Sequence, residues 1–341
     1  MAIVTKSVGS AGGRDYSTIA AFVAALPANL VTAGDSWVGE LYNDSEFSET
    51  VTLAGHTTDA THTIKLTAAT GQSFQDNASV QTNQLHYDVT KGVGIKSNVY
   101  IDPGISITDD NWTLSRIQVQ PYGGGHYGVY ITGGSTTVMD SMLIDACNAG
   151  PAIGNRISGA VRNCLIMVDG ASFAVGVDLS SNPTYTNCTI VRIGHTSPTG
   201  TGFGSGYSGS SCKTINCAVF GFSTVTDSPS HWTHTTGVTD VASPPTGYTG
   251  GTTYTNQFVD TGVTYANADF RAKAGADLLN VATTDATNLP AAIDIAKTAR
   301  PQGAAWDVGA WELAASAHAL FFPASLSGLG SGGPFFSDRL E

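Results

Sequence analysis

The chain has 341 residues, of which only 12% are charged, against about 25% in an average soluble protein. Gly occurs 40 times and Thr 42 times, a composition typical of strands and turns rather than helices. With 15 basic and 27 acidic residues the net charge is −12, which argues against a nucleic-acid-binding protein, and the 41% hydrophobic content argues against wholesale disorder.

The amino-terminal region predicts one short helix followed by strands. Residues 1–7 lack the charged and apolar regions of a secretory signal, so we expect a chain made in the cytoplasm and not exported by the usual route. Ile19, Phe22, Val23 and Leu26 have helical spacing that ends before Pro27. Residues 50–70 alternate in the manner of strands.

Short motifs that begin with a small residue recur through the middle of the chain. They begin at Gly104, Gly128, Ala152, Gly176 and Gly202, so that their successive steps are 24, 24, 24 and 26. A fixed period in this range indicates a repeat architecture.

A second series runs beside the first with nearly the same period. It begins at Ser115, Asp140, Asn163, Asn187 and Asn216, so that its successive steps are 25, 23, 24 and 29. Each position starts or lies within a short apolar-rich run of strand length. Two series with one period predict two strands per repeat.

These repeats predict an all-β fold, a parallel β-helix solenoid with about 24 residues per coil. The main alternative, a leucine-rich repeat, requires a regular leucine frame that the sequence lacks. An open stack of coils needs caps, and the predicted helix at residues 19–26 is expected to cover the first coil.

Stacked coils also predict ladders of equivalent side chains. The Asn residues of the second series are expected to form an amide ladder at a bend, where their role is structural. Cys164, Cys188 and Cys217 follow these Asn residues and are expected to form an inward stack of reduced, inert thiols. The five cysteines include no CxxC pair, so we predict neither a zinc site nor a catalytic thiol.

The period is lost at residues 227–265, which are rich in Ser, Pro, Thr, Gly and Tyr. We expect a loop or a lateral excursion from the coils here, and we interpret His231-Trp232-Thr233-His234 as part of an exposed aromatic loop. The two histidines have no nearby Cys or carboxylate partner at metal-ligand spacing except the distant Asp240, so we predict no metal site.

The two ends of the chain resemble known β-helix proteins. The closing motifs resemble those of the pectin-lyase-like superfamily, whose fold is a right-handed parallel β-helix, and the opening motif is similar to the start of β-helix proteins of tailed bacteriophages. The residues that carry these resemblances are Asp269-Phe270-Arg271, Ala274-Gly275-Ala276-Asp277, Arg300-Pro301-Gln302-Gly303, Asp307-Val308-Gly309-Ala310-Trp311-Glu312 and, at the start, Gly12-Gly13-Arg14-Asp15-Tyr16-Ser17-Thr18-Ile19.

The resemblance suggests two kinds of polysaccharide-cleaving site, and both need charged residues stacked on consecutive coils. Asp145 and Asp169 are one period apart and Arg192 follows almost one period later, so these three are the candidates for a tailspike depolymerase. The alternative is that they are ordinary residues at the ends of ladders. No Glu lies within the repeat, which favours this alternative, and we predict no catalytic, cofactor-binding or metal-ligating residue and no cofactor.

The segment after Glu312 has a different character. It contains Phe321, Phe322, Phe335 and Phe336 among Gly and Ser, a composition that favours contact with another protein. The alternative is a tail folded back on its own solenoid.

The predicted divisions are an amino-terminal cap at 1–49, the β-helix at 50–312 and an assembly tail at 313–341. No membrane span is expected, because the apolar window 304–326 contains charged residues and a proline.

The sequence and its resemblance together predict a non-enzymatic structural protein of a tailed-phage virion, made in the host cytoplasm. It would decorate the head or form part of a fibre or tail appendage, and bind other virion proteins through its tail. A homotrimer is implied by the resemblance alone. Besides the depolymerase, the alternative is a carbohydrate-binding module that holds a host surface glycan on Tyr122, Tyr127, Trp232 and Tyr248. Neither nucleic acid nor membrane is an expected partner.

Overall fold

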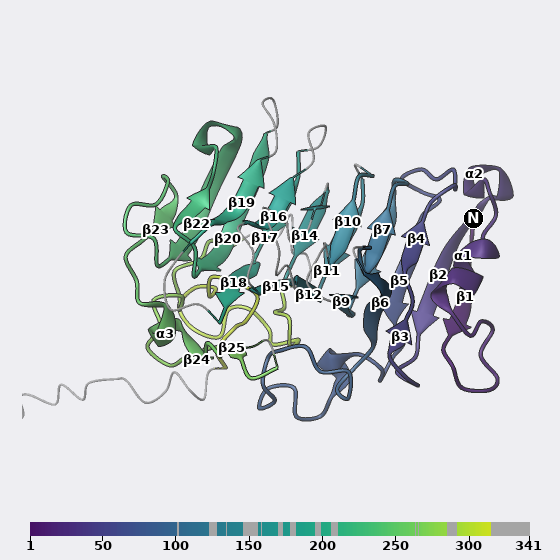
Figure 1. Cartoon of the computed structure of the whole chain (residues 1–341), viewed down its shortest axis with the longest axis horizontal. Coiled ribbons are helices and arrows are strands. Elements are labelled where there is room, and N and C mark those ends of the chain that lie inside the picture. The colour runs from purple at the N-terminus through teal and green to yellow at the C-terminus, as the bar shows by residue number, and fades with distance from the viewer. Residues whose placement is uncertain are drawn as a thin grey trace, which may run out of the picture.

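The structure is a computed structural model, and it shows an elongated stack of parallel strands with few helices (Figure 1). It describes residues 1–314 except 101, 123–127, 134, 146–155, 158, 170–172, 178–181, 195–198, 206–210, 263, 265 and 285–291. The tail at 315–341, including its four Phe residues, lies outside the described residues.

Successive strands take turns on three faces of the stack, so that each strand from β2 to β17 pairs with the strand three places further along the chain. The first face contains β1 (Ala2–Val8), β2 (Asp35–Leu41), β5 (Ile64–Ala68), β8 (Trp112–Ser115), β11 (Thr137–Met139), β14 (Ala160–Arg162) and β17 (Thr184–Thr186). The second contains β3 (Phe47–Ser48), β6 (Gly94–Tyr100), β9 (Gln118–Tyr122), β12 (Met142–Asp145), β15 (Leu165–Asp169) and β18 (Thr189–Ile193). The third contains β4 (Val51–Leu53), β7 (Ile105–Ile107), β10 (Val129–Ile131), β13 (Arg156–Ile157), β16 (Phe173–Val177), β19 (Thr201–Ser205) and β21 (Thr224–Thr226).

The last strands of the stack turn from the first face onto the second. β20 (Cys212–Phe220) pairs with β17 in its first half and with β18 in its second half. β22 (Trp232–Thr239) follows β20 along both faces, and β23 (Tyr248–Thr249) pairs with β22. The prediction of an exposed loop at 227–265 is therefore wrong for β22, which forms part of a further coil.

The second sequence series marks the corner between the first and second faces. Arg116, Asp140, Asn163, Asn187 and Asn216 all have positive φ angles, between 49° and 61°. Asn tolerates this left-handed conformation better than most residues, which explains why it recurs there. The predicted amide ladder at a bend is confirmed only between Asn216 and Asn187, where the Asn216 side-chain amide donates to the Asn187 Oδ1 at 3.0 Å. The Asn163 Oδ1 and the Asn187 Nδ2 have no hydrogen-bond partner in the described structure.

The prediction of two strands per repeat is wrong, because each regular coil contributes three. The corner series stands between two strands rather than at the start of one. The first-face strands before the corner are only three residues long in β11, β14 and β17, too short to show a pattern of their own. β1 and β2 already belong to this face, so the division predicted at residue 49 falls inside the sheet.

One hydrophobic core fills the inside of the coils. It includes a run of fully buried aliphatic and aromatic side chains together with Cys164, Cys188 and Cys217. All three cysteines are reduced, and burial raises the pKa of Cys188 and of Cys217 well above the usual thiol range. The predicted stack of inert thiols is confirmed, since a thiol held neutral is a poor nucleophile.

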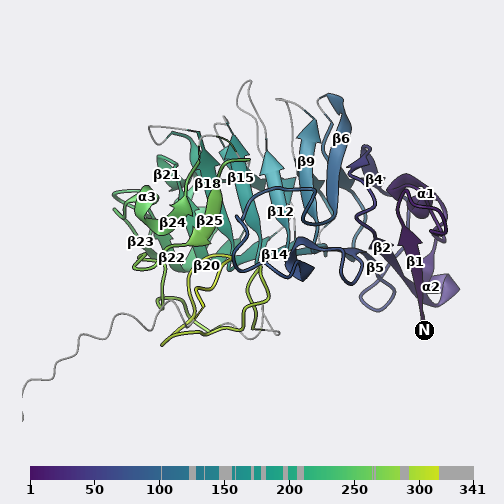
Figure 2. The ribbon, with the colours of Figure 1, turned by 90° about the horizontal axis from the view of Figure 1, so that it is seen from below.

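A second core lies outside the coils, against the second face. Figure 2 shows the backbone of residues 258–260 and 269–272 close to β15 and β18. This core joins outward side chains such as Met167, Val191 and Phe220 to residues of two irregular segments, 74–89 and 258–311. The later segment contains the antiparallel pair β24 (Phe258–Asp260) and β25 (Asp269–Ala272), and α3 (Tyr254–Gln257) precedes it. Its attachment uses the corner, because the Asn163 and Asn216 side-chain amides donate to backbone carbonyls of Ile293 and Thr283, each at 2.7 Å.

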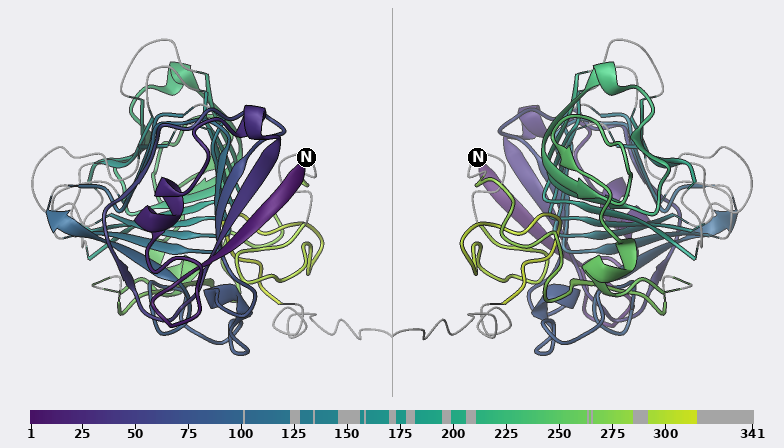
Figure 3. Two further views of the ribbon diagram at one scale, coloured as in Figure 1. Left: turned by 90° about the vertical axis from the view of Figure 1, so that its right-hand side faces the viewer. Right: turned by 90° about the vertical axis from the view of Figure 1, so that its left-hand side faces the viewer.

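The helices are short and lie outside the strand series. α1 (Ile19–Ala24) lies at the amino-terminal end of the stack (Figure 3), with Ile19, Phe22 and Val23 buried. The others are α2 (Leu30–Ala33), α3 and the single turns η1 (Phe74–Asp76) and η2 (Pro229–His231). None of the helices in the described ranges has the length and apolarity to cross a membrane.

Candidate functional site

The register of the second face separates the two aspartates that a depolymerase would need side by side. Asp145 pairs with Val168, which in turn pairs with Arg192. Asp169 is one position further along β15 and pairs with Ile193. Asp145 and Asp169 therefore occupy different positions on neighbouring coils, and the predicted stack of these two residues is wrong. Their side chains lie outside the described part of the structure.

Arg192 is held by a structural contact within its own coil. It is 6% exposed, and its Nη1 donates to the carbonyl of Thr199 at 2.8 Å. The Tyr254 hydroxyl donates to the carbonyl of Arg192 at 3.0 Å. This bond ties residues 254–311, which lie beside the coils and are called the lateral segment, to this strand. Burial lowers the pKa of the guanidinium. These contacts give Arg192 a role in packing.

Other acidic side chains near the coils are occupied by backbone groups. The Asp109 carboxylate accepts from the N–H groups of Gly55 and His56, at 3.0 and 2.8 Å. Both Asp240 oxygens accept from the N–H of Gly221 at 3.1 Å. No group of three or more His, Cys, Asp or Glu side chains suited to a metal ion occurs among the described residues.

Two of the aromatic residues predicted to stack on sugars are buried in the last coils. Trp232 and Tyr248 are 6% and 9% exposed. The Trp232 ring contacts Phe203, with centroids 4.8 Å apart, because the end of the inner core needs large side chains to close it. Their prediction as exposed platforms is wrong. Tyr122 is 47% exposed, while Tyr127 lies outside the described residues.

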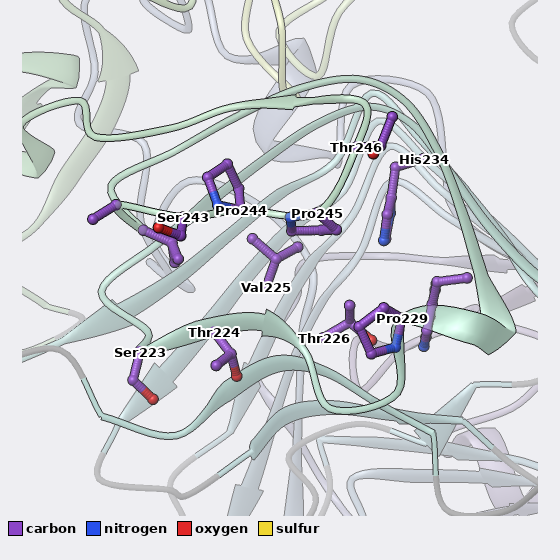
Figure 4. Close-up of a pocket in the computed structure, with 13 residues that line it drawn as sticks. Ser223, Thr224, Val225, Thr226, Pro229, His234, Ser243, Pro244, Pro245 and Thr246 are labelled. Carbon is purple, nitrogen blue, oxygen red and sulfur yellow. The ribbon is translucent and has the colours of Figure 1, made fainter.

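A hollow of about 710 Å³ opens at the carboxy-terminal end of the stack (Figure 4). Its wall is formed by β21, by the start of β22 and by the loop at 241–246, and every lining residue is uncharged. Among these residues are Ser223, Thr224, Thr226, Trp232, His234 and Pro245. This hollow was not predicted, because the loss of the period at residues 227–265 indicated a loop. The strand β22 could have been recognised from Thr233-His234-Thr235 and Val238-Thr239, because β-branched residues favour strands.

His234 is the one titratable side chain in the wall of this hollow. Its Nδ1 lies 2.8 Å from the Thr214 hydroxyl, and burial lowers its pKa to about 4, so the ring is neutral at pH 7. Its Nε2 and the Trp232 Nε1 have no hydrogen-bond partner in the described structure. Both of these nitrogens are buried, so the polar groups of the wall are the Ser and Thr side chains and the neutral imidazole.

A buried ionic cluster fixes the closing motif that resembles other β-helix proteins. The Arg300 Nη1 donates to the Glu312 Oε2 at 3.1 Å and to the carbonyl of Asp307 at 2.8 Å, and both charged side chains are fully buried. Asp294 accepts from the N–H of Glu312 at 2.8 Å. The N–H of Gly309 donates to the carbonyl of Asn216 at 2.9 Å, which ties the cluster to the coils. The cluster acts as a structural clamp.

We expect the clamp to make the protein more stable at pH 5 than at pH 7. Burial raises the pKa of Asp294 to about 6, above its usual value of 3.8. The folded state therefore binds more protons than the unfolded state between about pH 4 and pH 6, and this contribution to stability is lost as the pH rises through 6. The whole contribution across the window is about 3 kcal/mol. Carboxylates with a lowered pKa, such as Asp15 with a pKa of about 2, change the stability only below this pH window.

Denaturant unfolding at a series of pH values measures this slope. The matched variant is Asp294→Asn, which cannot titrate and is expected to flatten the dependence between pH 5 and pH 7. Relief of the net charge of −12 on acidification has the same sign in both proteins, so the difference between the two slopes is the diagnostic quantity. Equal slopes would show that Asp294 does not titrate in this range.

Comparison with known proteins gives a likeness of fold only. No family model and no curated protein matches the sequence. Among solved structures, a pectate lyase, Pel9A, is 13% identical, with 92% of this chain and 96% of that chain covered and a TM-score of 0.42. The pectin methylesterase from Aspergillus niger in deglycosylated form is 15% identical, with 83% and 92% covered and a TM-score of 0.45. Both are parallel β-helix proteins, as is the stack described here.

Proposed function

We propose that this chain is a non-enzymatic structural protein of a tailed-phage virion, acting in assembly and surface display as a head decoration or as part of a fibre or tail appendage. The observation that carries the proposal is the register of the second face, in which Asp145 and Asp169 are offset by one position and do not pair. The side chains of Asp109, Asp240 and Arg192 near the coils bond backbone groups.

The proposal includes the finer features of the fold. The coils are right-handed and follow the period of the sequence, a size supported by the pairing of Ile105 with Val129. The buried face of α1 supports its role as the cap of the first coil. Such a rigid rod with a small charged fraction suits a building block of a particle.

The proposed partners are other virion proteins and further copies of the chain, bound through residues 313–341. The stretch 313–337 contains no Asp, Glu, Lys or Arg, and it follows directly after the clamp at Glu312. Four Phe side chains in this stretch provide apolar area for a contact. A trimer is the proposed oligomer, and the virion is the proposed location.

The test compares the full chain with a variant in which Phe321, Phe322, Phe335 and Phe336 are all replaced by Ser. Light scattering is expected to show a trimer for the parent and a folded monomer for the variant, because about 2 kcal/mol or more is lost with each buried anchor. Tyr122→Ser removes an exposed aromatic of the coil surface and is the matched control, expected to leave association unchanged. Equal association of parent and variant would contradict the assembly role.

A depolymerase would be revealed by a different measurement. Purified protein incubated with host surface polysaccharide is expected to release no reducing ends or unsaturated products. Cleavage that disappears in the Asp145→Asn, Asp169→Asn variant would overturn the non-enzymatic proposal.

A further inference from the structure

The last coil of the stack lacks its third strand. β22 continues both the first and the second face, but the third face ends at β21. After Asp240 the chain crosses the end of the stack in the loop at 241–246 and returns to pair with β22 through β23. The hollow lies between β21 and this loop, in the place where a further third-face strand would lie (Figure 4).

The edge of β21 that faces the hollow is open. The N–H of Asp227 donates to the carbonyl of Phe203 in β19 at 3.3 Å, and Phe203 is the register partner of Thr226. In a parallel pair this pattern directs the N–H and carbonyl of Thr226 away from β19. Among the described residues neither group has a partner, and β21 pairs with no strand other than β19. An open edge of this kind accepts an added strand.

The hollow has the chemistry of a peptide-binding slot. Its wall carries no charged side chain, and the neutral His234 ring extends into it in Figure 4. An extended peptide brings backbone carbonyls and N–H groups, which satisfy the open edge of β21.

We propose that this hollow binds the carboxy-terminal segment, residues 315–341, of a second copy of the chain, which adds a strand to β21. This inference rests on the proposed function, because it names the partner surface of the assembly tail. The segment fits because its first part, 315–337, contains no Asp, Glu, Lys or Arg and so matches the uncharged wall of the hollow. Each copy offers one tail and one hollow, and such a head-to-tail contact forms a ring like the proposed trimer where the rotation between copies closes.

Proline at position 226 tests the edge without disturbing the bonds to β19. Thr226→Pro removes the outward N–H, at a position where edge strands tolerate proline, and it also removes the side-chain hydroxyl, which accepts from the N–H of Ser228 at 3.3 Å. The concentration needed for half-association is expected to rise about tenfold or more, as expected for loss of an interchain hydrogen bond and the added ring. Thr226→Val lacks the hydroxyl but keeps the N–H, and is expected to associate within about twofold of the parent.

Ile3→Pro is the matched control at the other end of the stack. β1 is also an edge strand, and the N–H of Ser7, which has the same orientation in the strand as that of Ile3, faces away from β2 toward Asp15. The N–H of Ile3 therefore points outward as well. Association of Ile3→Pro is expected to match that of the parent.

Two further measurements on the full chain need no variant of β21. A synthetic peptide of residues 315–341 is expected to dissociate the oligomer. Hydrogen exchange is expected to show protection of residues 222–228 that increases with protein concentration. Protection independent of concentration would mean that each copy binds its own tail, and would overturn the inference.

The failure of this inference is distinct from the failure of the proposed function. If the chain associates through its tail but neither Thr226→Pro nor the peptide affects association, the tail binds elsewhere and only the hollow is excluded. If neither self-association nor partner binding depends on the tail, the assembly role itself fails.

Discussion

Replacing Arg300 by Met is expected to lower the free energy of unfolding by about 3–5 kcal/mol. The guanidinium is the cation of the clamp, and it lies among Asp294, Asp307 and Glu312, all fully buried. Removal of one partner leaves the remaining buried charges uncompensated, which costs far more than the intact pair contributes. Urea denaturation followed by circular dichroism at pH 7 measures the loss.

The same variant has a distinctive pH dependence. At pH 5 the difference from the parent is expected to shrink, because burial raises the pKa of Asp294 to about 6 and also raises that of Glu312. The control is Arg14→Met, which removes a partly exposed pair with Asp44 and is expected to cost less than about 1 kcal/mol. A loss below about 1 kcal/mol for Arg300→Met would show that the clamp contributes little to stability.

Replacing Phe220 by Ala is expected to cost about 3–5 kcal/mol, the usual range for a buried Phe. The ring is fully buried on the outer side of β20. It stacks on Tyr254 with centroids 5.7 Å apart and meets Phe258 edge-on at 5.4 Å. The substitution leaves a cavity between the coils and the lateral segment, and weakens the attachment of that segment.

Denaturation and limited proteolysis together separate the two parts of this effect. The unfolding midpoint reports the total cost, and faster cleavage within 254–284 is expected to report the loosened segment. Val259→Ala is the control, since Val259 is 48% exposed beside Phe258, and is expected to change stability by less than about 0.5 kcal/mol. Unchanged proteolysis in Phe220→Ala would show that the segment is held by the corner contacts and the clamp alone.

The corner series shows why part of the fold could be predicted. Asn163, Asn187 and Asn216 recur because a left-handed backbone position favours Asn, so a local requirement produced a visible period. Each of the three cysteines follows one of these Asn residues, so the same period predicted that their side chains stack. The structure shows that these side chains point into the core. The strands before the corner escaped prediction because such short strands with no special conformation leave no pattern.

The candidate catalytic residues show the opposite case. Asp145 and Asp169 are one full period apart in the sequence, but the strand register is shorter by one position, because Met142 pairs with Leu165. Residues 23 apart are paired between these two strands, so residues 24 apart are offset by one position. The sequence spacing does not show whether the one additional residue of the period lies in the turn before these strands or in the turn after them. The strand register therefore excludes the stacking of Asp145 on Asp169.

The sequence by itself determined the repeat, the parallel β-helix and the buried thiols, because these follow from local backbone preferences and from periodicity. Only the tertiary structure decided the third strand of each coil, the register of Asp145 and Asp169, and the open end at β21. It also decided the attachment of the lateral segment, in which Asn216 bonds Thr283 across 67 positions of the chain. Such contacts depend on which distant segments pack together, and no local pattern in the sequence encodes that choice.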